Sequence, residues 1–271
     1  MSGLDGRKIL LAGAGKMGGA LLRGWLAAGV SARDITVIDP APSQDMASYL
    51  IVKQVALNPP KINQPDVAVI AVKPQMMDEV LPAVAQHFGP LTMVVSIAAG
   101  TTIESLAAHV GERAIVRAMP NTPAAIGRGI SVLVANDATS DKQRLLAESL
   151  LAVSGKVEWI DDESLMDAVT AVSGSGPAYV FLLAECLAAA GIKAGLEEGL
   201  AVKLARETVA GAGELLHRAE EPAAVLRENV TSPGGTTAAA LQVLMAPDNG
   251  LPPLMEKAVA AAKKRGRELA G

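Results

Sequence analysis

Aromatic side chains, cysteine and histidine are all scarce in this chain of 271 residues. Only 2% of the residues are aromatic, and the sequence contains one cysteine and three histidines. A single cysteine excludes a disulfide within the chain and a zinc site built on several cysteines. His87, His109 and His217 are far apart and share no ligand spacing. We therefore expect no metal site.

Long basic runs and long uncharged apolar runs are also lacking. The longest basic run, Lys263-Lys264-Arg265, closes an Ala-rich helical stretch, where cations are favourable. With a net charge of −4, the chain offers no basic face for nucleic acid. No window of about 18 residues is uncharged and wholly apolar, and the N-terminal residues lack a signal pattern. We expect a cytoplasmic protein that binds neither nucleic acid nor a membrane.

Apolar residues are abundant instead. They make up 50% of the chain, against 19% for charged residues, which is typical of a globular protein. A length of 271 residues suits one large domain or two modest ones. Because aromatic residues are few, Ala, Leu and Val must fill the core, and such small side chains let helices approach closely.

Strands and helices alternate over the first 160 residues. Short apolar runs predict strands, and apolar residues at helical spacing predict helices between them. The predicted strands cover residues 8–12, 35–38, 67–71, 93–97, 114–117, 130–134 and 156–159, and the predicted helices cover residues 16–28, 75–87, 102–110 and 140–152. This alternation indicates an α/β fold with a doubly wound sheet of the Rossmann type.

The pattern changes after Trp159. Acidic residues that suit a helix start come next, and no later segment has the pattern of a strand. Gly174 and Gly176 predict a break between helices. We expect a dinucleotide-binding domain at residues 1–160 and an all-helical domain at residues 161–271. The Ala-rich, apolar helices of the second domain suggest burial against a second subunit, as in a dimerisation domain.

A glycine-rich turn follows the first predicted strand and opens the first predicted helix. Its sequence, Gly13-Ala14-Gly15-Lys16-Met17-Gly18, has the spacing G-x-G-x-x-G. In this context Gly13 allows a tight turn, Gly15 lets a pyrophosphate approach the backbone, and Gly18 lets helix and strand pack closely. The free N–H groups of the helix start favour the phosphates. The turn therefore predicts a dinucleotide cofactor.

Asp39 bears on which dinucleotide binds. It ends the second predicted strand, where an acid binds the adenosine ribose of NAD(H) and repels the 2′-phosphate of NADP(H). Arg33 or Lys53 could approach the same group, and the loop that starts at Pro40 has no predictable path. The residues thus leave the choice between NAD(H) and NADP(H) open.

Three further loops lie at the carboxyl ends of predicted strands, where open α/β sheets bind ligands. Prolines stiffen two of them, and small residues in the third leave room for a nicotinamide ring. The loops are Ala71-Val72-Lys73-Pro74, Ala98-Ala99-Gly100 and Met119-Pro120-Asn121-Thr122-Pro123.

Two glycine-bearing segments precede apolar helices in the helical half. They are Ser173-Gly174-Ser175-Gly176-Pro177-Ala178-Tyr179 and Ser232-Pro233-Gly234-Gly235-Thr236-Thr237. A helix start has unpaired N–H groups, which suit a carboxylate. Helix capping alone explains either segment, but the presence of both beside a dinucleotide-binding domain favours a small anionic substrate.

Taken together, these motifs resemble the pyrroline-5-carboxylate reductase family. The segment at residues 172–179 looks like the family signature, and the segment at residues 230–237 resembles its second hallmark. The loops at residues 71–74, 96–100 and 117–123 match in the same order. The resemblance spans nearly the whole chain and is weakest at residues 39–64, where the cofactor would be selected.

The resemblance implies reduction of 1-pyrroline-5-carboxylate to L-proline by hydride transfer from NAD(P)H, usually NADPH, as the last step of proline biosynthesis. It also implies interlocked dimers, often assembled further into decamers. Beyond the glycine turn, the implied cofactor contacts are Asn58, Ala71, Val72, Lys73, Pro74, Ile97, Ala98, Ala99 and Asn229. Glu220, Thr236 and Thr237 match residues of the substrate pocket, and Gly234 and Gly235 add helix-start N–H groups.

The implied chemistry needs few catalytic groups. A protonated imine is already electrophilic, so the protein mainly positions two rings and anchors a carboxylate. The ring nitrogen takes its proton from solvent or from a hydroxyl such as that of Thr237, our candidate catalytic residue. A β-hydroxyacid dehydrogenase is a rival, but its catalytic lysine is missing from residues 178–190. A cofactor-binding sensor without turnover is the other, and the second glycine segment disfavours it.

Overall fold

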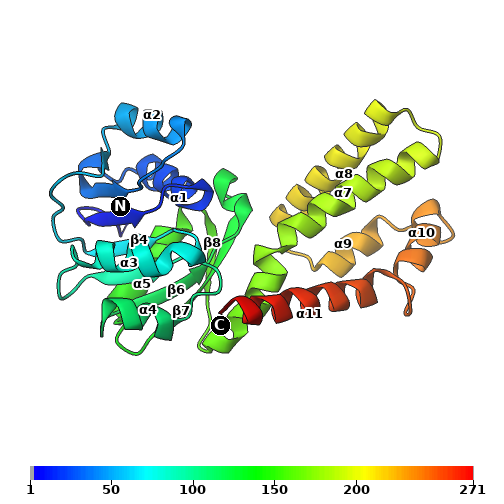
Figure 1. The fold of residues 1–271 in the computed structure, drawn as a ribbon. Helices are drawn as coiled ribbons and strands as arrows, with labels where there is room; N and C mark the ends of the chain where they lie inside the picture. The colour runs from blue at the N-terminus through cyan, green and yellow to red at the C-terminus, as the bar shows by residue number, and fades with distance from the viewer. Residues whose placement is uncertain (1–2, 271) are drawn as a thin grey trace. The chain divides into compact units, whose positions relative to one another are not determined.

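The computed structural model describes residues 3–270, which form two compact units (Figure 1). One unit contains the described residues up to Gly174 together with those from Ala262 onward. The other runs from Ser175 to Ala261. The division after residue 160 that the sequence predicts coincides with the end of the last strand, Trp159. As a domain boundary it stays a prediction.

The first unit is built on one eight-stranded sheet. The strands are β1 (Ile9–Ala12), β2 (Ile35–Ile38), β3 (Ala56–Leu57), β4 (Val67–Ile70), β5 (Met93–Ser96), β6 (Ile115–Met119), β7 (Gly129–Ala135) and β8 (Gly155–Trp159). Their order across the sheet is β3-β2-β1-β4-β5-β6-β7-β8. Chain progression reverses between β1 and β4, and such a switch point opens a ligand crevice at the carboxyl ends of the strands.

Helices cover both faces of this sheet (Figure 1). The apolar faces of α1 (Lys16–Ala27), α2 (Gln44–Lys53) and α5 (Asp141–Ala152) share one core cluster. Those of α3 (Met77–Ala85) and α4 (Ile103–Val110) belong to a second cluster. The doubly wound α/β fold that the sequence predicts is confirmed.

The central strands follow the predicted ranges because they are apolar on both faces. Every residue of β1, β4 and β5 is buried. Alternate residues supply the two core clusters, as Leu10 and Leu11 of β1 illustrate. A continuous apolar run of this length is typical of a parallel strand between two helical layers.

Two features of the sheet were not predicted. The segment between β2 and β4 contains α2 and the two-residue strand β3, in a stretch where Pro40 and Pro42 obscure the pattern. Strand β7 is antiparallel to β6, whereas the other pairs in the sheet are parallel. Only a short 3₁₀ turn, Thr122–Ile126, separates β6 from β7. A parallel pair needs a longer crossover connection, so a connection this short makes the two strands antiparallel.

Helices make up the remainder of the described chain after β8. They include η4 (Glu163–Leu165), α6 (Met166–Val169), a π-helical turn (Thr170–Gly174), α7 (Gly176–Lys193), α8 (Glu198–Arg218), α9 (Ala223–Asn229), α10 (Thr236–Leu244) and α11 (Leu251–Ala270). The all-helical character of the C-terminal half is therefore confirmed for the described residues.

The predicted break at Gly174 and Gly176 is present but short. A π-helical turn ends at Gly174, Ser175 forms a bend and α7 begins at Gly176, within a nearly continuous helical stretch from Glu163 to Lys193. A Cβ atom at position 174 would lie 2.5 Å from Cε of Met119, the flexible end of that side chain, so Met119 would have to shift to make room for a larger residue. π-helical turns inside helices are frequent at functional sites.

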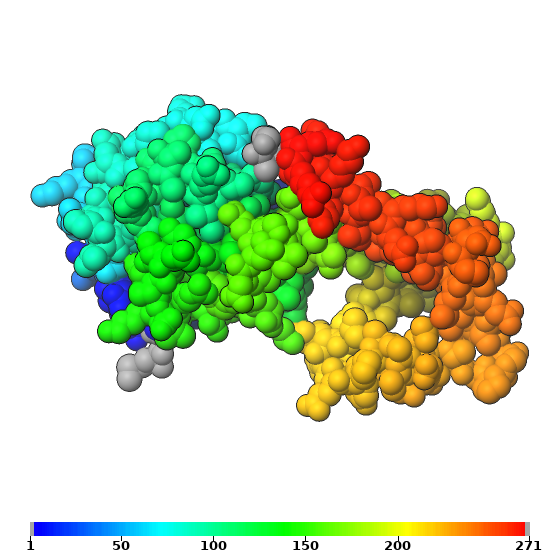
Figure 2. All heavy atoms as spheres, turned by 90° about the horizontal axis from the view of Figure 1, so that it is seen from below, coloured from blue at the N-terminus to red at the C-terminus, as the bar shows by residue number. Residues whose placement is uncertain are grey.

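The helices of the second unit, drawn from yellow-green to orange in Figure 2, expose many apolar side chains. Phe181, Leu182 and Leu183 of α7 and Leu204 of α8 are about half exposed, while Ala201 and Ala205 are buried. Within the described residues, one helical stretch, the one that starts at Glu163, has the length and apolar character of a membrane span. A helix that packs against a partner chain has the same character, so composition alone does not separate the two.

Candidate active site

The glycine-rich turn has the geometry that its sequence predicts. Gly13 has a φ of +92°, and a Cβ atom there would lie 2.7 Å from the Ala71 carbonyl oxygen. A Cβ atom on Gly18 would collide with the Gly13 carbonyl oxygen, so glycine lets α1 pack against the turn. Gly15 differs, because its Cβ position has no heavy atom within 4 Å. The space beside Gly15 is therefore free for a ligand.

The start of α1 can bind an anion. Gly15 is its N-cap residue, and no side chain in the described chain caps this helix end. The first N–H groups of a helix have no partner within the helix, and they carry its positive potential. An open glycine cradle beside an uncapped helix start fits the pyrophosphate of a dinucleotide.

A cavity of about 750 Å³ lies along the carboxyl ends of β1, β2 and β4. It is lined by residues of the glycine turn, by Asp39 and by other residues that were predicted to contact the cofactor. Its lining includes Gly13, Gly15, Asp39, Asn58, Ala71, Val72 and Lys73. The topological switch of the sheet thus brings these predicted contacts together.

A second cavity of about 930 Å³ lies on the α1 side of the turn and was not predicted. Ala14 and Lys16 line it, and Gly15 and Asp39 line both cavities. The Arg23 guanidinium, also in its lining, donates to Asp45 at 2.8 Å, and so part of its charge is already paired. The two cavities together make a groove around the turn.

Asp39 is held by backbone groups. Its Oδ2 accepts a hydrogen bond from the Ala14 N–H at 2.8 Å, and its Oδ1 accepts one from the Ala41 N–H at 2.9 Å. Asn58 bonds the Asp39 backbone at both its N–H and its carbonyl, at 3.0 and 2.7 Å. The Asp39 carboxylate therefore closes the glycine turn as well as facing the groove, a role that the sequence did not reveal.

The remaining predicted contacts of the first unit differ in accessibility. Ala99 is exposed, whereas Ile97 and Ala98 are buried beneath it in the loop after β5. Pro74 begins the short helix Pro74–Met76 at the exit of β4. Met17 packs against the core cluster under α1. Neither Met17 nor Gly18 lines the two cavities, and both support the turn from behind.

The predicted substrate residues lie in the second unit. Gly234 has a φ of +69°, and Gly235 is the N-cap of α10, which begins with Thr236 and Thr237. No side chain of the described residues caps this helix, so its first N–H groups can donate hydrogen bonds to an anionic ligand. Thr237 is half-buried.

Two predicted residues flank α9. Glu220 is exposed in the connection that precedes this helix, and Asn229 is its last residue. Their assignment to substrate and cofactor stays a prediction.

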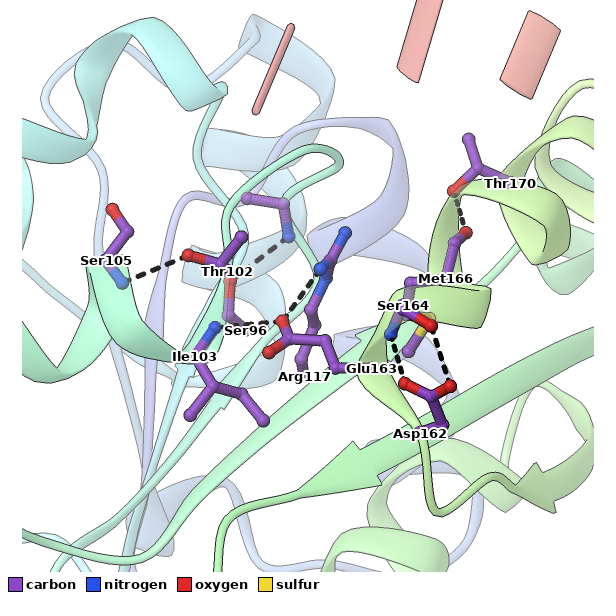
Figure 3. Close-up of polar contacts among 11 residues, drawn as sticks. Ser96, Thr102, Ile103, Ser105, Arg117, Asp162, Glu163, Ser164, Met166 and Thr170 are labelled. Carbon is purple, nitrogen blue, oxygen red and sulfur yellow. Dashed lines mark hydrogen bonds and ion pairs between the residues drawn. The ribbon is translucent and has the colours of Figure 1, made fainter. Parts of the chain in front are cut away.

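A polar network at the ends of β5 and β6 was missed by sequence reasoning (Figure 3). Arg117 of β6 is 5% exposed, and its Nη1 atom lies 2.7 Å from Glu163 Oε1. The same carboxylate oxygen accepts a hydrogen bond from the Ile103 N–H at 2.9 Å. The signal in the sequence was a single arginine inside an otherwise apolar strand.

The neighbouring Asp162 caps the helical stretch that Glu163 begins. Its carboxylate accepts hydrogen bonds from both the hydroxyl and the N–H of Ser164, at 2.7 and 2.8 Å (Figure 3). These two bonds, that of the hydroxyl first, lower the pKa of the Asp162 carboxyl from its ordinary value. Asp162 is therefore a helix cap held in its charged form.

The described residues contain no group of three or more His, Cys, Asp and Glu side chains that could hold a metal ion. A doubly wound sheet with an open glycine cradle, an uncapped helix and a crevice at its switch point defines an oxidoreductase that uses a nicotinamide dinucleotide.

Comparison with known proteins identifies the family. The family described as "Pyrroline-5-carboxylate reductase dimerisation" matches residues 163–269, and the family described as "NADP oxidoreductase coenzyme F420-dependent" matches residues 8–100. Pyrroline-5-carboxylate reductase of Pseudomonas aeruginosa is 43% identical to this chain over 266 residues, which is 97% of either chain. The chain therefore belongs to the pyrroline-5-carboxylate reductase family.

Solved structures agree with this assignment. The pyrroline-5-carboxylate reductase of Coxiella burnetii superposes with a TM-score of 0.89 at 33% identity, covering 98% of this chain and 99% of that one. The pyrroline carboxylate reductase of Plasmodium falciparum, solved with NADP bound, superposes with a TM-score of 0.80 at 28% identity, with the same coverage. The resemblance inferred from the motifs is thus confirmed over nearly the whole chain.

Proposed function

We propose that this protein reduces 1-pyrroline-5-carboxylate to L-proline with a hydride from NAD(P)H, the last step of proline biosynthesis. The observation that carries the proposal is full-length similarity to pyrroline-5-carboxylate reductases, together with an open glycine cradle where a pyrophosphate fits. The family match to a dimerisation domain indicates an oligomer.

The first unit would hold the cofactor through its backbone. The N–H groups at the start of α1 face the pyrophosphate, and Gly15 leaves it room. Asp39, Asn58 and Lys73 line the adenosine side of the groove. The exposed Ala99 of the loop after β5 offers a small, apolar platform to the nicotinamide ring. When bound, the reduced cofactor supplies the hydride.

The second unit would hold the substrate. The N–H groups at the start of α10 bind its carboxylate, and Glu220 with Thr236 and Thr237 completes the pocket. The protonated imine accepts the hydride at carbon, so the C=N double bond becomes a single bond and the ring nitrogen keeps its proton. That proton comes from solvent or from the Thr237 hydroxyl, and orientation of the two rings provides most of the rate enhancement.

The direct test is oxidation of NADPH and NADH by the purified protein in the presence of 1-pyrroline-5-carboxylate. We expect turnover that depends on both substrates, with L-proline as the product. Failure of both cofactors to react, with protein shown to be folded by circular dichroism, would contradict the proposed activity.

Replacement of Asp39 tests cofactor choice. Asp39→Ser should raise the NADPH/NADH ratio of kcat/KM, because it removes the negative charge that repels a 2′-phosphate. The structure adds a control, since Asp39 also closes the glycine turn through Ala14 and Ala41. Asp39→Asn keeps an acceptor oxygen but loses the charge, and it should shift the ratio in the same direction with less loss of affinity. If neither ratio moves, the loop after Asp39 decides the preference.

Assembly provides a further prediction. The exposed apolar side chains of α7 and α8 would be covered by a second copy, in an interface above roughly 2,000 Å² in total. Light scattering at micromolar protein should give at least twice the protomer mass, with a decamer as the higher state we propose. Burial in this interface would also explain why the helical stretch from Glu163 to Lys193 is so apolar, without insertion into a membrane. We therefore propose a cytoplasmic enzyme.

A pair of leucine variants sharpens that test. Leu183→Glu places a charge on α7 and should shift the protein towards the monomer, whereas Leu91→Glu alters an exposed leucine of the first unit and should not. Monomeric wild-type protein, or equal effects of the two variants, would argue against an interface on α7.

A further inference from the structure

Arg117 is the only charged residue in the buried class among those whose burial is described. Its guanidinium has five N–H donors, yet within the described chain it makes one hydrogen-bonded ion pair, to Glu163 Oε1. Burying a cation is costly, and an ion pair of this kind is often no more stabilising than apolar side chains of similar volume. Stability alone is therefore a poor explanation for the pair.

The position of the pair is more informative. Glu163 Oε1 also accepts the Ile103 N–H, at the first residue of α4. Residues 97–102, the loop proposed to support the nicotinamide ring, lead directly into this residue. Figure 3 shows Glu163 between Arg117 and Ile103, with the carboxylate facing both. One carboxylate thus ties the exit of the nicotinamide loop to β6.

The entry of the same loop is held by a neighbouring strand residue. Ser96, the last residue of β5, is paired in the sheet with Arg117 and is fully buried. Its hydroxyl accepts a hydrogen bond from the Ala98 N–H at 3.3 Å. Both ends of the loop are therefore anchored beside Arg117.

The pair also anchors the helical stretch that follows the sheet. Glu163 begins this stretch, and further along it the Ser173 carbonyl accepts a hydrogen bond from Asn121 Nδ2 at 3.2 Å. Asn121 lies just beyond the end of β6, and its Oδ1 accepts the Ile130 N–H at 3.0 Å. Two contacts from the β6 region thus hold the segment from Glu163 to Ser173.

We propose that Arg117 and Glu163 form a positioning pair for hydride transfer. The pair fixes the position of the nicotinamide loop, residues 97–102, relative to the helical segment at residues 163–173. The inference rests on the proposed reductase function. Neither residue lines the two cavities around the glycine turn. The pair therefore governs the placement of the reacting ring rather than the affinity of the whole cofactor.

Removal of the cation is the first test. Arg117→Met should lower kcat by roughly ten- to a hundred-fold, since small misplacements of reacting groups have effects of this size. The Kd for NADPH should change by less than about threefold, because the pyrophosphate and adenosine contacts persist. The kinetic isotope effect with NADPH deuterated at the transferred position should rise, as hydride transfer becomes rate-limiting. Arg117→Lys keeps the charge and should recover part of kcat.

The partner residue gives a second route. Glu163→Ala removes the shared acceptor but leaves the Arg117 cation buried without its partner, so the double variant Arg117→Met/Glu163→Ala, which removes both charges, carries the test if a single variant does not fold. Because the two residues act as one unit, the double variant should lose no more kcat than the more damaging single variant.

Arg113→Met is the matched control. Arg113 lies at the other end of β6 and donates to the Val110 carbonyl, away from the nicotinamide loop, so kcat should be retained. Losses of kcat that add in the double variant, or wild-type kcat and isotope effect in folded Arg117→Met protein, would overturn the proposal. Wild-type protein without turnover would instead contradict the reductase function itself.

Discussion

Gly15→Val should nearly abolish NAD(P)H binding while the protein stays folded. The branched side chain would fill the space in which the pyrophosphate must lie, and it would separate the phosphates from the N–H groups of α1. Each hydrogen bond to a charged group is worth about 1.5–3 kcal/mol, so losing two of them should raise the Kd by roughly a hundredfold or more. Fluorescence titration with NADPH measures this directly.

The structure supplies the control for this variant. The Cβ position of Gly15 is free of heavy atoms within 4 Å, so valine should be tolerated by the empty protein. Gly18→Ala, in contrast, places a methyl group against the Gly13 carbonyl and should lower the melting temperature. Unchanged NADPH affinity in Gly15→Val would place the phosphate site elsewhere.

Thr237→Ala should lower kcat/KM for 1-pyrroline-5-carboxylate by roughly ten- to a hundred-fold, since a hydrogen bond to a charged group is worth about 1.5–3 kcal/mol. Thr237 is the second residue of α10, whose start lacks a side-chain cap among the described residues. In the proposed mechanism its hydroxyl bonds the carboxylate or the ring nitrogen. Cofactor affinity should barely change, because the proposed pyrophosphate site is at the start of α1.

The division of the effect between KM and kcat identifies the partner of the hydroxyl. If the hydroxyl only holds the carboxylate, KM should rise at constant kcat, whereas a bond to the ring nitrogen during hydride transfer should lower kcat as well. Thr237→Ser retains the hydroxyl and should recover most of the activity. Wild-type kcat/KM in Thr237→Ala would leave Thr237 without a role in the reaction.

The sheet was largely predictable because its central strands are fully buried and bounded by glycine or polar turns. The apolar runs that became β1, β4 and β5 have no polar face that could suggest a surface helix. The direction of β7 was not predictable, because an apolar strand looks the same in either orientation. The direction of β7 follows from the short turn at Thr122–Ile126. The sequence showed that this connection is short, but it did not show in which direction the connection leads the chain.

Residues of the candidate site could be predicted only where they belong to a short sequence pattern. The glycine turn is such a pattern, since its spacing and its position between strand and helix determine its conformation. The bond from Ala14 to Asp39 spans 25 residues, and the pair of Arg117 and Glu163 spans 46, so neither has a local signature. The glycines at 174 and 176 predicted the bend at Ser175, but not the π-helical turn before it, which has no local signature in the sequence.

The exposed apolar helices of the second unit have a consequence for the amount of enzyme that a cell must make. A chain whose apolar helices are covered only by a second copy has a stability that depends on protomer concentration. Dilution should therefore reduce specific activity as well as total activity, and the loss should reverse on concentration if the separated chains do not aggregate. At low expression a smaller fraction of the chains would be paired, so fewer chains would carry an active site. Total activity should therefore rise more steeply than the protein concentration when that concentration is low.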